Sequence, residues 1–166
     1  MNELYREIMV KRKTSVGKQL LKVLMIGLTV LMFLAGMALW PALIAAVALG
    51  IACYFVIPKF NVEYEYLYVN GDLDIDAIYS QQKRKRIAEY HMEEVEILAP
   101  EKSHVLDCYR NKNDIKVKDF TSHEPNAKVY VLIVNKDNAK QMVKVELDDI
   151  VIGDMRRIAP RKVNLM

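Results

Sequence analysis

Residues 23–57 read VLMIGLTVLMFLAGMALWPALIAAVALGIACYFVI, and no Asp, Glu, Lys, Arg or His interrupts them. A charge-free apolar stretch of this length predicts insertion into a membrane, because about 18 such residues already suffice for one span. A single straight helix over the stretch would be roughly 50 Å long, whereas the hydrocarbon core is about 30 Å thick. We therefore expect two spans rather than one.

The break between the two spans is expected at Trp40-Pro41. Proline disfavours helix at the residue before it and suits the first turn of a new helix, while tryptophan prefers the membrane interface. These features predict a two-helix transmembrane hairpin over residues 17–58, with helices at about 17–39 and 41–57. A single tilted span and a cleaved signal peptide are the alternatives, but the apolar region is too long for either.

Small residues recur at every fourth position of the second expected helix, at Ala42, Ala46 and Gly50. Such a stripe lets two helices approach closely in lipid. It is either the surface that packs against the first helix or an interface with a second copy of the chain, and we favour the first interpretation. The apolar stretch 23–57 carries no charged residue, which predicts an anchor rather than a channel or a transporter.

Positive charge is concentrated before the first helix. Six Lys and Arg residues stand among residues 1–22 and Lys59 follows the second helix, whereas the turn at Trp40-Pro41 has none. The positive-inside rule then places both termini and the soluble domain in the cytoplasm of a multi-pass cell-membrane protein.

Residues 1–16 form a basic cytoplasmic leader. An apolar face made by Leu4, Tyr5, Ile8 and Met9 is compatible with an interfacial helix, and a plain polar leader is an alternative of about equal weight. Candidate contacts with lipid headgroups in the leader are Lys11, Arg12 and Lys13.

Beyond the hairpin, residues 60–166 show the pattern of short strands. Alternation over 62–68 and 73–79 around Asn70-Gly71 predicts a β-hairpin, with 81–86 as a basic loop and 87–99 as a third strand. Further strands are expected at 115–120, 129–134 and 142–147, with a helical turn at 104–109 and a turn at 136–138. Asp148 is placed to cap a final helix with an apolar face, which ends before Pro160.

This order predicts an α+β, mainly β domain: an antiparallel barrel of six to seven strands with one C-terminal helix. The basic leader, the two-helix hairpin and the stretch NVEYEYLYVNGDLDID at 61–76 resemble bacterial membrane proteins with a pleckstrin-homology-like domain. Nearly the whole chain resembles a small uncharacterised bacterial family of two-span membrane proteins, a domain of unknown function. The resemblance implies a layout and a membrane location, but no catalytic residue.

The search for chemistry gives no catalytic, cofactor-binding or metal-ligating residue. Asp72, Asp74 and Asp76 have the spacing of a calcium loop, but Ala77 and Lys83 stand where the loop needs Gly and Glu. The histidines lack metal-ligand spacing, and the phosphate-binding and nucleophile motifs are absent. We expect no enzyme, no cofactor and no metal.

Charge also limits the partners. Residues 1–22 carry +4, so the remainder carries +3 − 4 = −1, which argues against nucleic-acid binding. The row Tyr64, Tyr66 and Tyr68 favours packing within a sheet over a binding platform. We expect a membrane-anchored, non-enzymatic binding or scaffold module with a protein partner or self-association, in contact with the lipid bilayer.

The alternative is an anionic-lipid sensor. Its candidate contacts are the cations of the loop at Lys83, Arg84, Lys85 and Arg86, each of which would gain about 1 kcal/mol near an anionic surface. A second basic cluster, Arg156, Arg157, Arg161 and Lys162, could also face lipid or simply suit a helix end.

Overall fold

The computed structural model describes residues 4–81, 83–112, 114–136 and 139–165. The chain forms two compact units. The hairpin unit comprises Lys13–Val62 and Tyr79–Lys83. The sheet unit combines the N-terminal strand, up to Arg12, with Glu63–Ile78 and the chain from Arg84 onward.

The hairpin unit contains α1 (Val16–Gly36), α2 (Trp40–Val56) and the short helix η1 (Ile57–Phe60). These bounds lie close to the predicted ones, and Pro41 stands in the first turn of α2 as expected. The segments Val16–Gly36 and Trp40–Phe60 are each long and apolar enough to span a membrane, and almost none of their length is buried within the protein.

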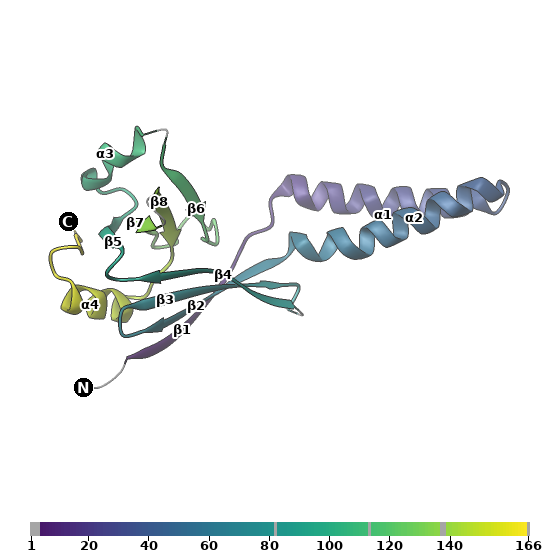
Figure 1. The fold of residues 1–166 in the computed structure, drawn as a ribbon. Helices are drawn as coiled ribbons and strands as arrows, with labels where there is room; N and C mark the ends of the chain where they lie inside the picture. The colour runs from purple at the N-terminus through teal and green to yellow at the C-terminus, as the bar shows by residue number, and fades with distance from the viewer. Residues whose placement is uncertain (1–3, 82, 113, 137–138, 166) are drawn as a thin grey trace. The chain divides into compact units, whose positions relative to one another are not determined.

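The two helices run side by side (Figure 1) and pack through small residues. At the turn, a Cβ atom on Gly36 would lie only 2.8 Å from the backbone nitrogen of Leu43, so the close approach requires glycine. Ala46 is 3% exposed, and Ala42 and Gly50 are half-buried. Ala46, in the middle of the small-residue stripe, is thus the most buried side chain of α2 within one copy of the protein.

The sheet unit contains the remaining strands, and among the described residues they form two four-stranded sheets (Figure 1). The first has the order β1-β2-β3-β4 and the second β5-β7-β8-β6. The bounds are β1 (Tyr5–Lys11), β2 (Val62–Val69), β3 (Asp72–Tyr79), β4 (Lys83–His91), β5 (Val95–Pro100), β6 (Lys116–Asp119), β7 (Tyr130–Lys136) and β8 (Ala139–Val145).

This arrangement corrects the predicted barrel of six to seven strands. The strands are divided between two sheets, and β6 pairs with β8 in parallel rather than antiparallel register. The single third strand predicted over 87–99 is wrong, because a turn at 92–94 separates β4 from β5 and the two strands enter different sheets. Alternating apolar residues on both sides of a short turn cannot by themselves reveal that the chain changes sheet.

Of the two interpretations of the leader, the interfacial helix is wrong. Residues Tyr5–Lys11 form β1, which pairs antiparallel with β2 and places Ile8 opposite Tyr66. Val10 is buried on the inner face of the sheet. The leader is therefore part of the sheet unit rather than a separate segment, because β2 offers an edge whose backbone groups need partners.

Several local predictions agree with the structure. Asn70 and Gly71 both have positive φ, at 48° and 102°, as a two-residue hairpin turn requires. The helical turn near 104–109 is present as η2 (His104–Leu106) and α3 (Asp107–Arg110). The turn predicted at 136–138 falls largely on residues 137 and 138, which lie outside the described residues.

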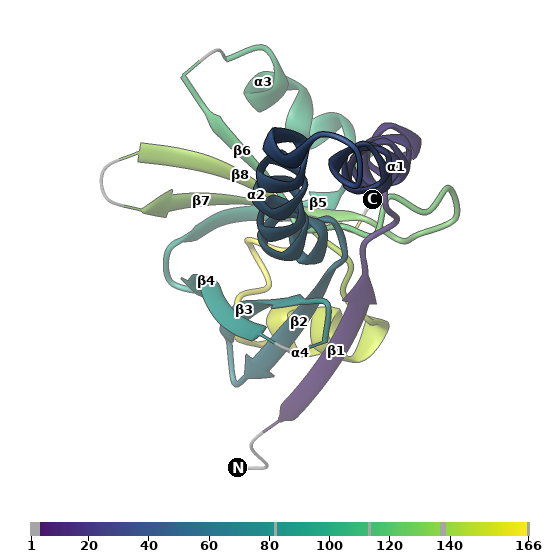
Figure 2. The same ribbon diagram turned by 90° about the vertical axis from the view of Figure 1, so that its right-hand side faces the viewer.

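The C-terminal helix α4 (Asp149–Ile158) begins as predicted, because Asp148 Oδ1 accepts a 2.8 Å hydrogen bond from the Val151 backbone N–H. Figure 2 shows α4 beside the β1–β4 sheet. Val151 and Met155 form the buried part of its apolar face, whereas Ile158 near its end is 44% exposed.

The tyrosine row of β2 packs inward, as expected of a sheet core. Tyr66 and Tyr68 are fully buried. Their hydroxyl groups donate hydrogen bonds to the Phe120 carbonyl oxygen at 2.7 Å and to Asp154 Oδ2 at 2.8 Å. Each buried hydroxyl is therefore satisfied, and the row ties the first sheet to other parts of the unit.

Candidate functional site

The outward face of β2, β3 and β4 carries an acid–base ladder. We use this name for Glu65, Asp74, Asp76, Arg84 and Arg86. Arg84 lies 2.5 Å from both Glu65 Oε2 and Asp76 Oδ2. Arg86 Nη2 lies 2.8 Å from Asp74 Oδ2, and its Nε lies 3.8 Å from Asp76 Oδ1. Alternation along each strand brings these groups to one face.

The ladder buries its acids and exposes its bases. The side chains of Glu65 and Asp76 are 6% and 7% exposed, whereas that of Arg84 is 51% exposed. Burial raises the pKa of Glu65, and the nearby Arg84 charge opposes that rise. The two arginines thus serve mainly to neutralise carboxylates that the fold has taken out of water.

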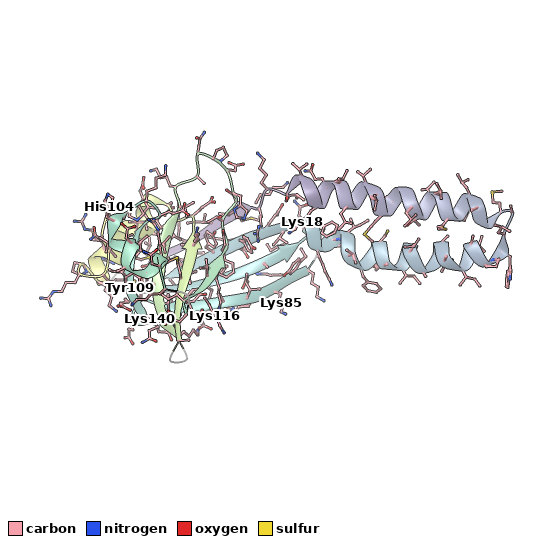
Figure 3. All side chains as sticks on the ribbon, turned by 90° about the horizontal axis from the view of Figure 1, so that it is seen from above. Lys18, Lys85, His104, Tyr109, Lys116 and Lys140 are labelled. Carbon is pink, nitrogen blue, oxygen red and sulfur yellow. The ribbon has the colours of Figure 1, made fainter. Side chains whose placement is uncertain are left out.

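This geometry corrects the interpretation of residues 81–86 as a basic loop. Lys83–His91 is a strand, and Arg84 and Arg86 are committed to the ladder, so only Lys83 and Lys85 of the four candidate lipid contacts remain outside it. Lys85 is exposed, as Figure 3 shows. A free cationic cluster on a loop is therefore not present here.

The aspartates at 72, 74 and 76 are each engaged by a basic side chain. Asp74 and Asp76 belong to the ladder, and Asp72 Oδ1 lies 2.7 Å from His91 Nδ1. This contact raises the pKa of His91. Among the described residues, no group of His, Cys, Asp or Glu side chains could hold a metal ion.

The candidate contacts of the leader behave differently from one another. Arg12 donates a 2.7 Å hydrogen bond to the Tyr64 hydroxyl and lies 2.9 Å from His123 Nε2. Lys11 is exposed and lies 3.8 Å from Glu63, and Lys13 is exposed at the start of the hairpin unit. Arg12 thus has a structural role within the sheet unit.

A hollow of the sheet unit lies on the other sheet, between α3 and β6–β8. It has a volume of about 450 Å³, and we call it the α3 cleft. Its floor is apolar and comprises Leu106, Ile115, Val131 and Met142. Its rim is basic and comprises Lys102, Arg110, Lys112 and Lys144.

The rim cations differ in how far they are neutralised. Lys144 Nζ donates a 2.7 Å hydrogen bond to Glu101 Oε1, and Arg110 Nη1 donates one of the same length to Asp107 Oδ1. Lys112 lies over the Tyr109 ring, 5.8 Å from its centroid. Within the described part of the chain, Lys102 and Lys112 form no ion pair with a carboxylate, so the rim keeps a positive excess.

An ordered network supports one end of the cleft. Tyr109 and Lys140, both labelled in Figure 3, donate hydrogen bonds of 2.8 Å and 2.6 Å to the Glu96 carboxylate. The bond from Lys140 and then that from Tyr109 lower the pKa of Glu96. The same bond to Glu96 raises the pKa of Tyr109 to about 12. The Tyr109 side chain is thus fixed in position at the side of the cleft, and its hydroxyl group is uncharged at neutral pH.

The cleft also adjoins an open strand edge. β6 is the terminal strand of its sheet and pairs only with β8 among the described strands. Val117, which lines the cleft, is 60% exposed on this edge. A hollow with an apolar floor, a basic rim and unpaired backbone groups alongside can receive an extended segment of a protein. No motif marks these residues in the sequence, because they come from five separate elements, η2, α3, β6, β7 and β8, and from the loops between them.

Comparison with known proteins agrees with this layout. Residues 2–165 match the family described as the bacterial PH-like domain, DUF6106. The chain belongs to this family. No curated protein and no solved structure matches the chain. The family resemblance read from the basic leader, the hairpin and the 61–76 stretch is thereby confirmed.

In this PH-like chain the match includes the hairpin as well as the sheet unit, since it extends over nearly every residue. The two apolar helices fit a two-span protein. The family description names no ligand, partner or reaction. The α3 cleft and the two apolar helices are the features that bear on function.

Proposed function

We propose that this protein is a membrane-anchored, non-enzymatic binding module whose α3 cleft receives an acidic segment of a partner protein that also carries an apolar side chain. The observation that carries the proposal is the apolar floor of the cleft beneath a rim with two unneutralised lysines. An apolar anchor gains from the floor, and acidic neighbours gain from Lys102 and Lys112.

The anchoring half of the proposal rests on the hairpin. Its two helices expose apolar side chains along their whole length, which is costly in water and favourable in lipid. The basic residues that flank α1 and η1 favour a cytoplasmic sheet unit. The partner would thus be bound at the inner membrane surface.

The orientation can be tested with a native cysteine. Cys108 is exposed in the sheet unit, and Cys53 lies in α2. We expect a membrane-impermeant maleimide to label Cys108 only after intact cells are permeabilised, with Cys108→Ser as the control. Labelling of Cys108 in intact cells would refute the cytoplasmic placement. Release of the protein by alkaline carbonate would refute the anchor.

The partner half is tested by site-specific photo-crosslinking of the full chain in its native membrane. A photoreactive amino acid at Val117 places the probe in the cleft, and one at Val69, which is 39% exposed on the other sheet, is the matched control. We expect a discrete protein adduct from position 117 that position 69 does not form.

Charge reversal then tests the mode of binding. The double variant Lys102→Glu, Lys112→Glu should reduce the adduct from position 117 about tenfold or more, because two attractive pairs become repulsive. An adduct containing only this chain would identify the partner as a second copy. The proposal fails if positions 117 and 69 give the same adducts, or if charge reversal leaves the adduct unchanged.

A further inference from the structure

Strands β6 and β8 separate the α3 cleft from a second hollow. Val117 and Met142 face the α3 cleft, whereas their neighbours Lys118 and Gln141 line a cavity of about 320 Å³. Side-chain alternation along a strand explains the division. β4 supplies the opposite wall of this second hollow, including Arg86, Glu89 and Tyr90, and we call the hollow the β4 cavity.

Two lysines converge in the β4 cavity. The Nζ atoms of Lys118 and Lys136 each lie 5.8 Å from the centroid of the Tyr90 ring. Lys136 also donates a 2.7 Å hydrogen bond to the Glu89 carbonyl oxygen. Within the residues that the structure describes, neither ammonium group forms an ion pair with a carboxylate. This contrasts with Arg86 at the mouth of the cavity, which is engaged by Asp74.

Two buried polar groups in the cavity wall lack hydrogen-bond partners. Tyr90 is 1% exposed and its hydroxyl has none, and Gln141 is 8% exposed and its Oε1 has none. A buried, unsatisfied polar group is destabilising. Burial, and then the Glu94 carboxylate that lies outside the lining, raises the pKa of Tyr90 to about 12. The Tyr90 hydroxyl therefore keeps its proton at neutral pH and remains a hydrogen-bond donor.

We propose that the β4 cavity binds a singly protonated phosphate group. Its charged oxygens would accept hydrogen bonds from Lys118, Lys136 and Tyr90, and its P–OH would donate to Gln141 Oε1. This set of contacts satisfies both unpartnered groups and neutralises both lysines. A carboxylate or a sulfate matches the lysines but has no proton to give Gln141. The site is independent of the proposed partner cleft, because it lies on the other face of β6.

The phosphate could belong to a small soluble molecule or to a phosphomonoester lipid headgroup. The first arm of the test measures binding of inorganic phosphate to the full-length protein in uncharged detergent by calorimetry. We expect saturable binding at neutral pH, with sulfate bound about tenfold more weakly because one hydrogen bond is missing.

Variants then assign the binding to the cavity. Lys118→Met and Tyr90→Phe should each weaken phosphate binding about tenfold or more. Gln141→Leu should remove the preference for phosphate over sulfate. Arg156→Gln, which removes an exposed charge from α4, is the control and should leave binding unchanged. Near-ultraviolet circular dichroism establishes that each variant is folded, and Tyr90→Phe deletes a single oxygen atom.

The second arm separates the two sources. Glycerol 3-phosphate in solution is compared with nanodiscs that contain phosphatidic acid, with protection of Lys118 from acetylation as the readout. Protection by either source supports the site and identifies the source. The proposal is overturned if neither source protects Lys118 and inorganic phosphate does not bind. It is also overturned if phosphate binding survives Lys118→Met and Tyr90→Phe, or if sulfate binds as tightly as phosphate.

Discussion

The ladder on β2–β4 and the β4 cavity use their cations in opposite ways. On β2–β4, arginines meet buried carboxylates, so that Arg84 alone contacts both Glu65 and Asp76. In the β4 cavity, Lys118 and Lys136 lie over the Tyr90 ring, and neither has a carboxylate partner among the described residues. A face whose cations pair with the protein's own carboxylates serves stability, whereas a cavity whose cations lack such partners is prepared for a ligand.

The largest expected effect comes from breaking the satisfied face. Arg84→Met leaves Glu65 and Asp76 buried without their main counter-charge. The loss should lower the free energy of unfolding more than any other change in this series, but less than the loss of a fully buried pair, because the guanidinium is half exposed. The difference in free energy of unfolding is measured by denaturant unfolding of the solubilised full chain, monitored by the circular dichroism of its tyrosines.

The control for this change is Lys85→Met, which removes the neighbouring exposed charge outside the ladder. It should change the free energy of unfolding by less than about 0.5 kcal/mol. Equal effects of the two variants would mean that the ladder contributes no more than an ordinary surface charge.

The second prediction has the opposite sign and concerns the β4 cavity. Gln141→Leu replaces an unpartnered buried acceptor with an apolar side chain of similar size. In the absence of phosphate it should raise the free energy of unfolding by about 1 kcal/mol, as seen in the same denaturant experiment. Asn126→Leu, at an exposed loop amide, is the control. Destabilisation by Gln141→Leu would show that this amide has a structural role.

The third prediction uses pH to test a satisfied contact on the second sheet. The pKa of Glu96 is lowered by its bonds from Lys140 and Tyr109. Its stabilising effect is therefore present above its ordinary pKa of 4.5 and is lost as pH falls through the lower folded value. Lys140→Met should cost about 0.5 kcal/mol at pH 7, since the pair is partly exposed. The difference from the unmodified chain should vanish in acid, and a difference independent of pH would contradict the assignment.

The smallest effect is expected at the exposed pair His91–Asp72. The pKa of His91 is raised by its contact with Asp72. The pair's stabilising contribution is therefore present below 6.5, the ordinary value, and is lost as pH rises through the folded pKa. Titration of the imidazole by NMR should give a pKa above 6.5 that falls in Asp72→Asn. If the pKa of His91 is the same in both proteins, the contact with Asp72 does not stabilise the folded state.

Local signals in the sequence predicted the elements that depend only on neighbouring residues. The absence of charge over 23–57 indicated two helices, Asn70-Gly71 indicated a turn with positive φ, and Asp148 indicated a helix cap. In each case the deciding interaction spans a few residues: a helical turn, a two-residue loop or a hydrogen bond across three residues.

These local signals could not predict which distant segments pair with one another. The leader fits a helical face as well as a strand, and β1 exists because the edge of β2, more than fifty residues away, is available to it. The basic run at 83–86 has the composition of a loop. It is a strand because Asp74, Asp76 and Glu65 lie across from its arginines.

The sequence by itself determined the hairpin, the main strands, the capped helix and the family of this protein, because periodicity and turn chemistry are local. Only the tertiary structure decided which charges are satisfied. Arg84 and Lys118 are both cations on strands, and nothing near either residue in the sequence separates their roles. The structure gives Arg84 two buried carboxylates and Lys118 a cavity, since electrostatic partners are set by distance in space and by exclusion of water.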